Sequence, residues 1–101
     1  MKITSNLADG VAVLALEGEL DLATADQLIT AVSDVLTGSS PHTLVIDLKA
    51  ISFCDSAGIR ALVFAHKEAR DAAAAMRITN ESGIVRRVLE ITGVHDLLNP
   101  E

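Results

Sequence analysis

One serine in the chain has neighbours that suit it to carry a phosphate. Asp55, Ser56 and Gly58 follow an apolar run at 44–48 and precede a long helical pattern, which places Ser56 in the first turn of a helix. A phosphate there adds about −1.5 to −2 charge at neutral pH, which the helix amides partly stabilise and Asp55 opposes. Gly58 has no side chain to shield this turn from a protein partner. With Asp55 as N-cap, the same residues also describe a plain capped helix start, and local chemistry alone favours that simpler interpretation.

The other residues capable of chemistry form no catalytic pattern. The flanks of Ser56 differ from the Gly-x-Ser-x-Gly turn of serine hydrolases. Asp47 ends a buried strand pattern, as in an aspartyl-phosphate receiver, but the chain has no early pair of adjacent acids to hold Mg²⁺. We expect Asp47 to hydrogen-bond the following loop, His66 to be a packed or surface histidine, and Cys54 to be a small buried hydrophobe. The three histidines are scattered, at His42, His66 and His95. The sequence predicts neither enzyme activity, nor a metal site, nor a cofactor.

The overall composition narrows the possible partners. The 101 residues carry a formal net charge of −6, which disfavours nucleic acid and anionic lipid as partners. This charge fits a partner with a basic patch, and it equally fits an acidity that only keeps a small protein soluble. Half of the residues are hydrophobic but only two are aromatic, so we expect one domain with a core of Ala, Val, Ile and Leu. The single cysteine excludes an internal disulfide, and no window reaches the ~18 apolar residues of a membrane span. A cytoplasmic protein that does not insert into a membrane is expected.

Hydrophobic patterning predicts an opening hairpin and two further strands. Asp9 and Gly10 indicate the hairpin turn, and 18–21 interrupts the pattern as a loop. The run at 43–48 is apolar on both strand faces apart from Asp47, which is typical of a strand covered by helices beside a parallel neighbour. Strands are expected over 3–7, 11–17, 43–48 and 76–79.

Three helices are expected between and after these strands. Thr24 and Gln27 have the spacing of a capping box, so the first helix begins at Thr24 and ends with Gly38 as its C-terminal cap. The second helix covers 56–75. Its predicted inward stripe consists of Ile59, Leu62, Val63, His66, Ala69 and Ala73. The third helix carries Ile84, Val85, Val88 and Leu89.

The elements follow the order β-β-α-β-α-β-α. Gly93 is expected to end the third helix, and a last helical turn to follow over 94–98. Strands that alternate with helices after an opening hairpin predict a small mixed sheet with helical cover. The fold class is therefore α/β, with a four-stranded mixed sheet in a single domain over 1–101.

Four segments, in this order, resemble the STAS domain of bacterial anti-sigma-factor antagonists. They are Gly18-Glu19-Leu20-Asp21, Leu44-Val45-Ile46-Asp47-Leu48, Asp55-Ser56-Ala57-Gly58 and Val88-Leu89-Glu90-Ile91-Thr92-Gly93-Val94. The likeness covers essentially the whole chain, including its length and element order. One departure is Ala57, where many members of the family have a second hydroxyl residue. This change removes a competing acceptor and leaves Ser56 in place.

The resemblance implies a partner-switching protein. In that family the serine at the position of Ser56 is phosphorylated by an anti-sigma factor that is itself a serine kinase. The unphosphorylated protein binds this kinase and frees a sigma factor, the phosphorylated form dissociates, and a phosphatase resets the cycle. A monomer or a weak dimer is expected. The implied contact surface consists of Glu19, Asp21, Thr24, Asp55, Ser56, Ala57 and Gly58.

A second hypothesis is a stand-alone STAS subunit that docks on a transporter, such as an ABC system for lipid trafficking. In that case Ser56 is only part of a constant docking face. Phosphate transfer from ATP by a soluble kinase indicates partner switching, whereas stable co-purification with a membrane complex indicates the transporter subunit.

Overall fold

The computed structural model describes residues 1–80 and 83–91, and its elements follow the predicted order. The strands are β1 (Lys2–Ala8), β2 (Val11–Leu20), β3 (Thr43–Cys54) and β4 (Ala75–Thr79). The helices are α1 (Ala25–Ser39), α2 (Ser56–Asp71) and α3 (Gly83–Ile91). None of these helices is long and apolar enough to cross a membrane. The predicted α/β class is confirmed, while Gly93 and the predicted turn over 94–98 lie outside the described residues.

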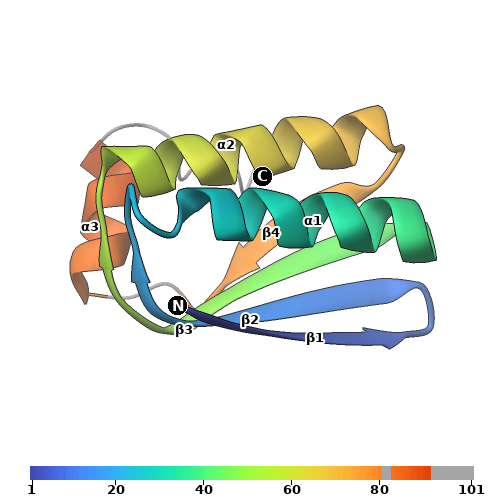
Figure 1. The fold of residues 1–101 in the computed structure, drawn as a ribbon, viewed down its shortest axis with the longest axis horizontal. Helices are drawn as coiled ribbons and strands as arrows, with labels where there is room; N and C mark the ends of the chain where they lie inside the picture. The colour runs from blue at the N-terminus through green and yellow to red at the C-terminus, as the bar shows by residue number, and fades with distance from the viewer. Residues whose placement is uncertain (81–82, 92–101) are drawn as a thin grey trace.

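The four strands form one mixed sheet in the order β1-β2-β3-β4. β1 and β2 pair antiparallel, and the turn residues Asp9 and Gly10 have φ values of 54° and 78°, the geometry that two-residue hairpins favour. β2, β3 and β4 run parallel, and a helix returns the chain between each pair. Figure 1 shows α1 and α2 side by side over one face of the sheet, with α3 at the end where the chain enters both helices. This end brings together the loops that follow β2 and β3.

The core lies between the helical layer and the sheet. It is aliphatic, as the composition predicts, and alternate strand residues such as Leu14, Leu16 and Ile46 are fully buried in it. The intervening residues of β3, such as Val45 and Asp47, are only half-buried. The second face of this strand is therefore less covered than the apolar run predicts, although its predicted parallel neighbours are present.

The segment 18–21, predicted as a loop, is mostly strand. β2 continues to Leu20, where it still pairs with Cys54 at the end of β3. The pairing shifts register at two places along this stretch, and Gly18 has a φ of 118° that glycine adopts readily. Bulged pairing interrupts the regular alternation of apolar and polar residues, which explains why the pattern indicated a loop.

Both ends of α1 differ from the prediction. Thr24 is the N-cap residue, but its side chain makes no capping bond to the helix. Gln27 Nε2 instead donates to the Met1 carbonyl oxygen at 2.6 Å. The predicted capping box is therefore wrong. At the other end, the left-handed residue after the helix is Ser40, with a φ of 48°, and not Gly38.

The second helix ends earlier than predicted, at Asp71. Ala73 takes a φ of 61°, and the Ala75 amide donates to the His42 carbonyl oxygen at 3.0 Å, which attaches the start of β4 to the sheet. Alanine is the strongest helix former, so the alanine run contains no local stop signal. Tertiary hydrogen bonding decides where this helix stops.

The inward face of α2 is rotated relative to the predicted stripe. Only Leu62 and Ala69 are shared, because the residues closest to the sheet are mostly small ones that allow a close approach of the helix. The buried residues of α2 are Gly58, Ala61, Leu62, Ala65 and Ala69. The remaining predicted residues are half-buried or exposed, namely Ile59, Val63, His66 and Ala73.

Candidate functional site

Ser56 is exposed and is the first residue of α2. Asp55 precedes it in an extended conformation, and its Oδ1 accepts a hydrogen bond from the Gly58 amide at 3.0 Å. The predicted N-cap is therefore confirmed. This bond satisfies one of the amides that a helix start leaves without a partner, and it fixes the direction in which the helix leaves β3. The Ser56 hydroxyl thus lies at the positive end of the α2 dipole, beside one carboxylate.

Gly58 lies inside the protein rather than on its surface. A Cβ atom at this position would overlap the Leu20 carbonyl oxygen and lie 3.0 Å from Cys54 Sγ. The expected open approach of a partner at Gly58 is wrong, because the missing side chain makes room for the end of β2. The Leu20 carbonyl oxygen also accepts a hydrogen bond from the Asp55 amide at 3.2 Å, which fixes the two loops against each other.

Thr24 and Asp21 hold the loop between β2 and α1 together. The Asp21 amide donates to Thr24 Oγ1 at 2.9 Å, and that hydroxyl donates to the Glu19 carbonyl oxygen at 2.8 Å. Asp21 Oδ1 in turn accepts from the amides of Ala23 and Thr24, at 3.0 and 3.2 Å. These bonds give Thr24 a structural role in shaping the loop. Through Leu20, the loop lies directly beside Asp55, so two of the predicted contact segments are adjacent.

Cys54 lies beneath this surface, with 3% of its area exposed. Burial, and secondarily the charge of Asp55, raise the pKa of its thiol to about 11. The neutral thiol is a poor nucleophile, because thiol chemistry proceeds through the thiolate. The prediction of a small buried hydrophobe is confirmed.

Asp47 makes side-chain hydrogen bonds within β3 and to the residue that follows β4. Its Oδ1 accepts hydrogen bonds from the Lys49 amide and from Asn80 Nδ2, both at 2.9 Å. Asp47 was expected to end its strand, but β3 continues to Cys54, so Lys49 is a strand residue and the expected bond to a following loop is wrong. The bond to Asn80 joins β3 to the residue after β4. No three His, Cys, Asp or Glu side chains within 1–80 and 83–91 are arranged to hold a metal ion.

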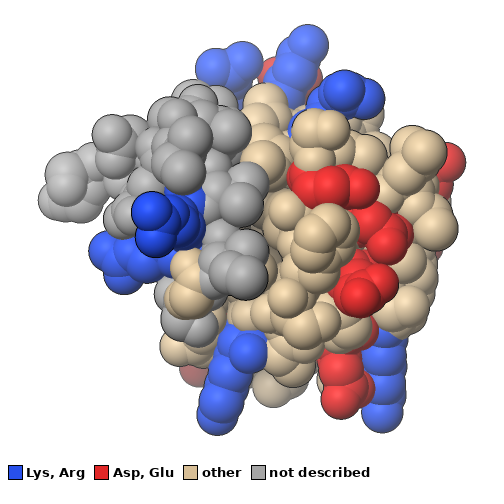
Figure 2. All heavy atoms as spheres, turned by 90° about the vertical axis from the view of Figure 1, so that its left-hand side faces the viewer, with Lys and Arg blue, Asp and Glu red and all other residues tan. Residues whose placement is uncertain are grey.

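Acidic side chains gather at this end of the protein. Figure 2 views the end where α1 and α2 begin and shows a band of acids on one side of it, with basic side chains above, below and to the left. Glu19 and Asp26 are exposed here, near the end of β2 and in the first turn of α1. A protein partner with basic groups would complement such a surface.

A small hollow beside Ser56 was not foreseen from the sequence. Leu22 and Phe64 line it, and both are exposed although they are large and apolar. The sequence signal was a large aliphatic residue in a loop, between Asp21 and Ala23. Ala57, which follows Ser56 directly, also lines the hollow.

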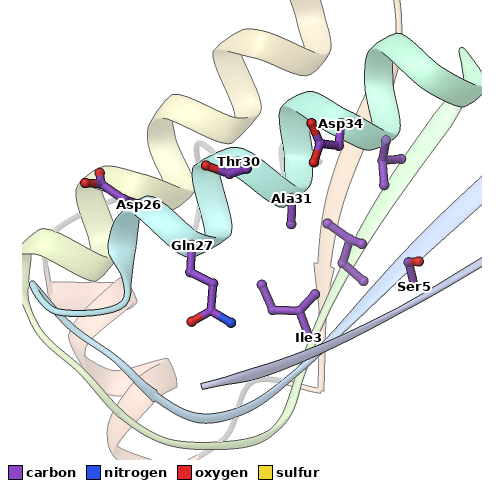
Figure 3. A pocket seen from close by; sticks show the side chains of 9 residues that line it. Ile3, Ser5, Asp26, Gln27, Thr30, Ala31 and Asp34 are labelled. Atoms are coloured by element: carbon purple, nitrogen blue, oxygen red, sulfur yellow. The ribbon is translucent and has the colours of Figure 1, made fainter.

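A larger hollow lies on the other side of α1, between that helix and β1 (Figure 3). Its volume is about 550 Å³, and its lining includes the apolar Ile3 and Leu14 together with the acids Asp26 and Asp34. No lining residue is cationic, so this hollow offers no counter-charge to a phosphate group. Asp26, in the first turn of α1, lies between the two hollows and lines both.

Known proteins are similar to this chain in sequence and in fold. A family model described as the STAS domain matches residues 2–101. The anti-sigma-F factor antagonist RsfB of Mycobacterium tuberculosis is 36% identical over 94 residues, which are 91% of this chain and 75% of that protein. An anti-sigma factor antagonist from Mycobacterium paratuberculosis has a crystal structure similar to this one, with a TM-score of 0.84 and 29% identity over 96% of this chain and 81% of that chain. The phosphorylated form of Bacillus SpoIIAA has a TM-score of 0.72 at 22% identity over 92% of this chain and 85% of that chain, a likeness of fold alone.

Proposed function

Because the chain belongs to the STAS domain family, we propose that it is an anti-sigma-factor antagonist whose binding is controlled by phosphorylation of Ser56. The unphosphorylated chain binds an anti-sigma factor that is also a serine kinase, and a sigma factor is released. Phosphate transfer to Ser56 dissociates the complex of the chain with the anti-sigma factor, and a phosphatase restores the unphosphorylated form that binds. The chain is thus a substrate and a regulator and not a catalyst.

The observation that carries the proposal is the exposed position of Ser56 at the start of α2, next to its capping residue Asp55. A kinase needs access to the hydroxyl, and a helix start offers partial stabilisation of the phosphate that results. The relatives named above supply further support, since both mycobacterial proteins are named antagonists of anti-sigma factors. SpoIIAA, which shares the fold, has been solved in unphosphorylated and phosphorylated forms.

The charge on the phosphate is large enough to control binding. Two like charges at ~4 Å near a protein surface repel by about 4 kcal/mol before salt screening. Screening and side-chain movement reduce this value, but a remainder of ~1.4 kcal/mol is still tenfold in affinity. The Gly58 amide already bonds Asp55, which leaves fewer amides to neutralise the phosphate and keeps that carboxylate beside it. We expect phosphorylation to weaken partner binding by roughly tenfold to a hundredfold.

Three variants test the proposal. Ser56→Ala is expected to keep partner binding but to accept no phosphate, and Ser56→Asp is expected to bind less well because it adds a negative charge at the contact. Ser39→Ala, at the far end of α1, is the matched control and is expected to behave as wild type in both respects, since Ser39 is an exposed serine distant in the fold from α2's first turn.

The measurement is a pull-down from the native lysate with intact-mass analysis of the bait before and after addition of Mg-ATP. The expected result is a kinase-like partner and the gain of one phosphate, which Ser39→Ala keeps and which Ser56→Ala and Ser56→Asp both lose because neither has the acceptor hydroxyl. Equal affinity of Ser56→Ala, Ser56→Asp and wild type for the kinase contradicts the proposal. Association with transporter subunits alone, without phosphate gain, favours the transporter hypothesis instead.

A further inference from the structure

Two large apolar side chains are exposed on one surface of the helical layer, one in the loop before α1 and one midway along α2. Leu22, in the loop that leads into α1, is 79% exposed, the highest value among the large hydrophobic side chains of the described residues. Phe64, on α2, is 43% exposed. Single exposed hydrophobic residues are ordinary, but a cluster that shares one concave surface marks an interaction site.

These two side chains line one hollow between α1 and α2. Ile29 lines it from α1, and Ala57 lines it from α2, on the same helix face as Phe64. The lining is therefore apolar over much of its area, and two oppositely charged residues complete it, Asp26 on α1 and Arg60 on α2. An apolar centre with a polar border is the arrangement of binding hot spots in protein interfaces.

The size of the hollow points to a protein side chain as the occupant. Its volume is about 220 Å³, and it is open to solvent. Sites for small organic molecules are typically ~300–1,000 Å³ and enclose most of the ligand. A space of this size instead accommodates one large aliphatic or aromatic side chain presented by another protein.

The position of the hollow indicates which protein supplies that side chain. Ala57 lines the hollow and directly follows Ser56, so a kinase whose active site reaches the Ser56 hydroxyl also covers this surface. Asp26 borders the hollow on the side of α1, and Glu19 is exposed at the end of β2. Arg60 balances Asp26 in the lining itself, but the chain carries a formal net charge of −6. That charge favours a partner with basic residues around its apolar side chain and disfavours a second copy of this chain.

We propose that the hollow between Leu22 and Phe64 is the anchor point of the anti-sigma factor, which inserts one aliphatic or aromatic side chain flanked by basic residues. This inference rests on the proposed function, because it takes the kinase of Ser56 as the occupant. Contacts in the hollow provide the affinity for the anti-sigma factor, and phosphorylation of Ser56 controls this binding. The anchor contact holds the unphosphorylated complex together, and a phosphate added next to Ala57 acts at the border of the same contact.

The test replaces each exposed apolar side chain by a polar one of similar length. Leu22→Gln and Phe64→Gln are expected to weaken binding of the partner by about tenfold to a hundredfold each, the range of interface hot spots. Leu7→Gln is the matched control, since Leu7 is 51% exposed but lies near the hairpin at the opposite end of β2 from Leu20. All three variants are expected to unfold at nearly the wild-type temperature, because surface substitutions change stability little.

The probe is the kinase-like protein that wild type retains from the native lysate, purified and titrated against each variant by calorimetry. Incorporation of phosphate at Ser56 is measured in parallel with the kinase in large excess. Leu22→Gln and Phe64→Gln are expected to accept one phosphate under these conditions, since the acceptor itself is unchanged.

The outcomes separate this inference from the proposed function. If Ser56→Asp loses binding while Leu22→Gln and Phe64→Gln bind as tightly as Leu7→Gln, the hollow is not the anchor point, and control of binding by Ser56 is supported. If Ser56 accepts no phosphate but Leu22→Gln and Phe64→Gln both lose the partner, the hollow is supported as the anchor point, and control of binding by phosphorylation is wrong. If Phe64→Gln retains every lysate protein that wild type retains, the anti-sigma factor does not occupy the hollow. If sedimentation shows that wild type is a dimer and that Leu22→Gln is a monomer, the occupant is a second copy of the chain and the assigned partner is wrong.

Discussion

Replacing Gly58 by alanine should destabilise the protein, although alanine is the better helix former. The added Cβ would overlap the Leu20 carbonyl oxygen and lie 2.9 Å from Leu20 Cγ and 3.0 Å from Cys54 Sγ. The carbonyl belongs to the backbone of β2 and also accepts the Asp55 amide, so it cannot turn away without breaking that bond. Overpacking of this kind costs ~1–3 kcal/mol, and the helical preference for alanine recovers ~0.5–1 kcal/mol.

Because the overlap is with a backbone atom, we expect an overpacking cost in the upper half of its range, ~2–3 kcal/mol. The net loss in the free energy of unfolding, measured by urea denaturation, is then about 1–2.5 kcal/mol, with a fall in Tm of roughly 5–20 °C. Gly38→Ala is the matched control, because Gly38 is also helical and a Cβ added there would meet no atom within 4 Å. That variant should gain ~0.5–1 kcal/mol. A Gly58→Ala protein as stable as wild type, or stabilised like Gly38→Ala, would refute the close packing of β2 against α2.

Three further predictions concern single side chains. Burial raises the pKa of the Cys54 thiol from 9.0 to about 11 in the folded chain, so the thiol should react slowly with iodoacetamide at pH 8 until urea is added. Since the unfolded chain loses this proton first, the free energy of unfolding should fall as pH rises from about 9 to about 11. Asp47→Ala removes the acceptor of the Lys49 amide and of Asn80 Nδ2 and should cost ~1–3 kcal/mol in urea denaturation, with a cost near zero counting against those bonds. Thr24→Val keeps the shape of the side chain but loses the hydrogen bonds of its hydroxyl, so we expect a loss of ~1–2 kcal/mol in the free energy of unfolding and weaker partner binding. Unchanged stability and unchanged binding would contradict the role of Thr24 in shaping the loop.

The sequence predicted features that depend on short stretches of chain. Asp55 as N-cap followed from an acid placed just before a helical pattern, and the hairpin turn at Asp9 and Gly10 followed from the preference of such pairs for positive φ. The element order was also predicted, because the period of apolar residues differs between strands and helices. Local chemistry fixes these features almost completely.

Features that depend on distant contacts were missed or wrong. The burial of Gly58 arises from the end of β2, far away in the sequence, and nothing beside Gly58 indicates that contact. The early end of α2 depends on the bond from Ala75 to His42, while the alanine run itself favours helix. The exposure of Leu22 and Phe64 likewise depends on how α1 and α2 pack, since either residue could have joined the core on sequence grounds.

In the proposed function, one phosphate on Ser56 controls binding to the anti-sigma factor. The most direct measurement is the dissociation constant of the purified kinase for the unphosphorylated chain and for the same chain carrying a single phosphate, with the modified residue identified by fragmentation mass spectrometry. We expect the phosphate on Ser56 and a dissociation constant at least about tenfold higher for the phosphorylated chain. Equal dissociation constants for the two forms, or a phosphate on a residue other than Ser56, would contradict the proposed function.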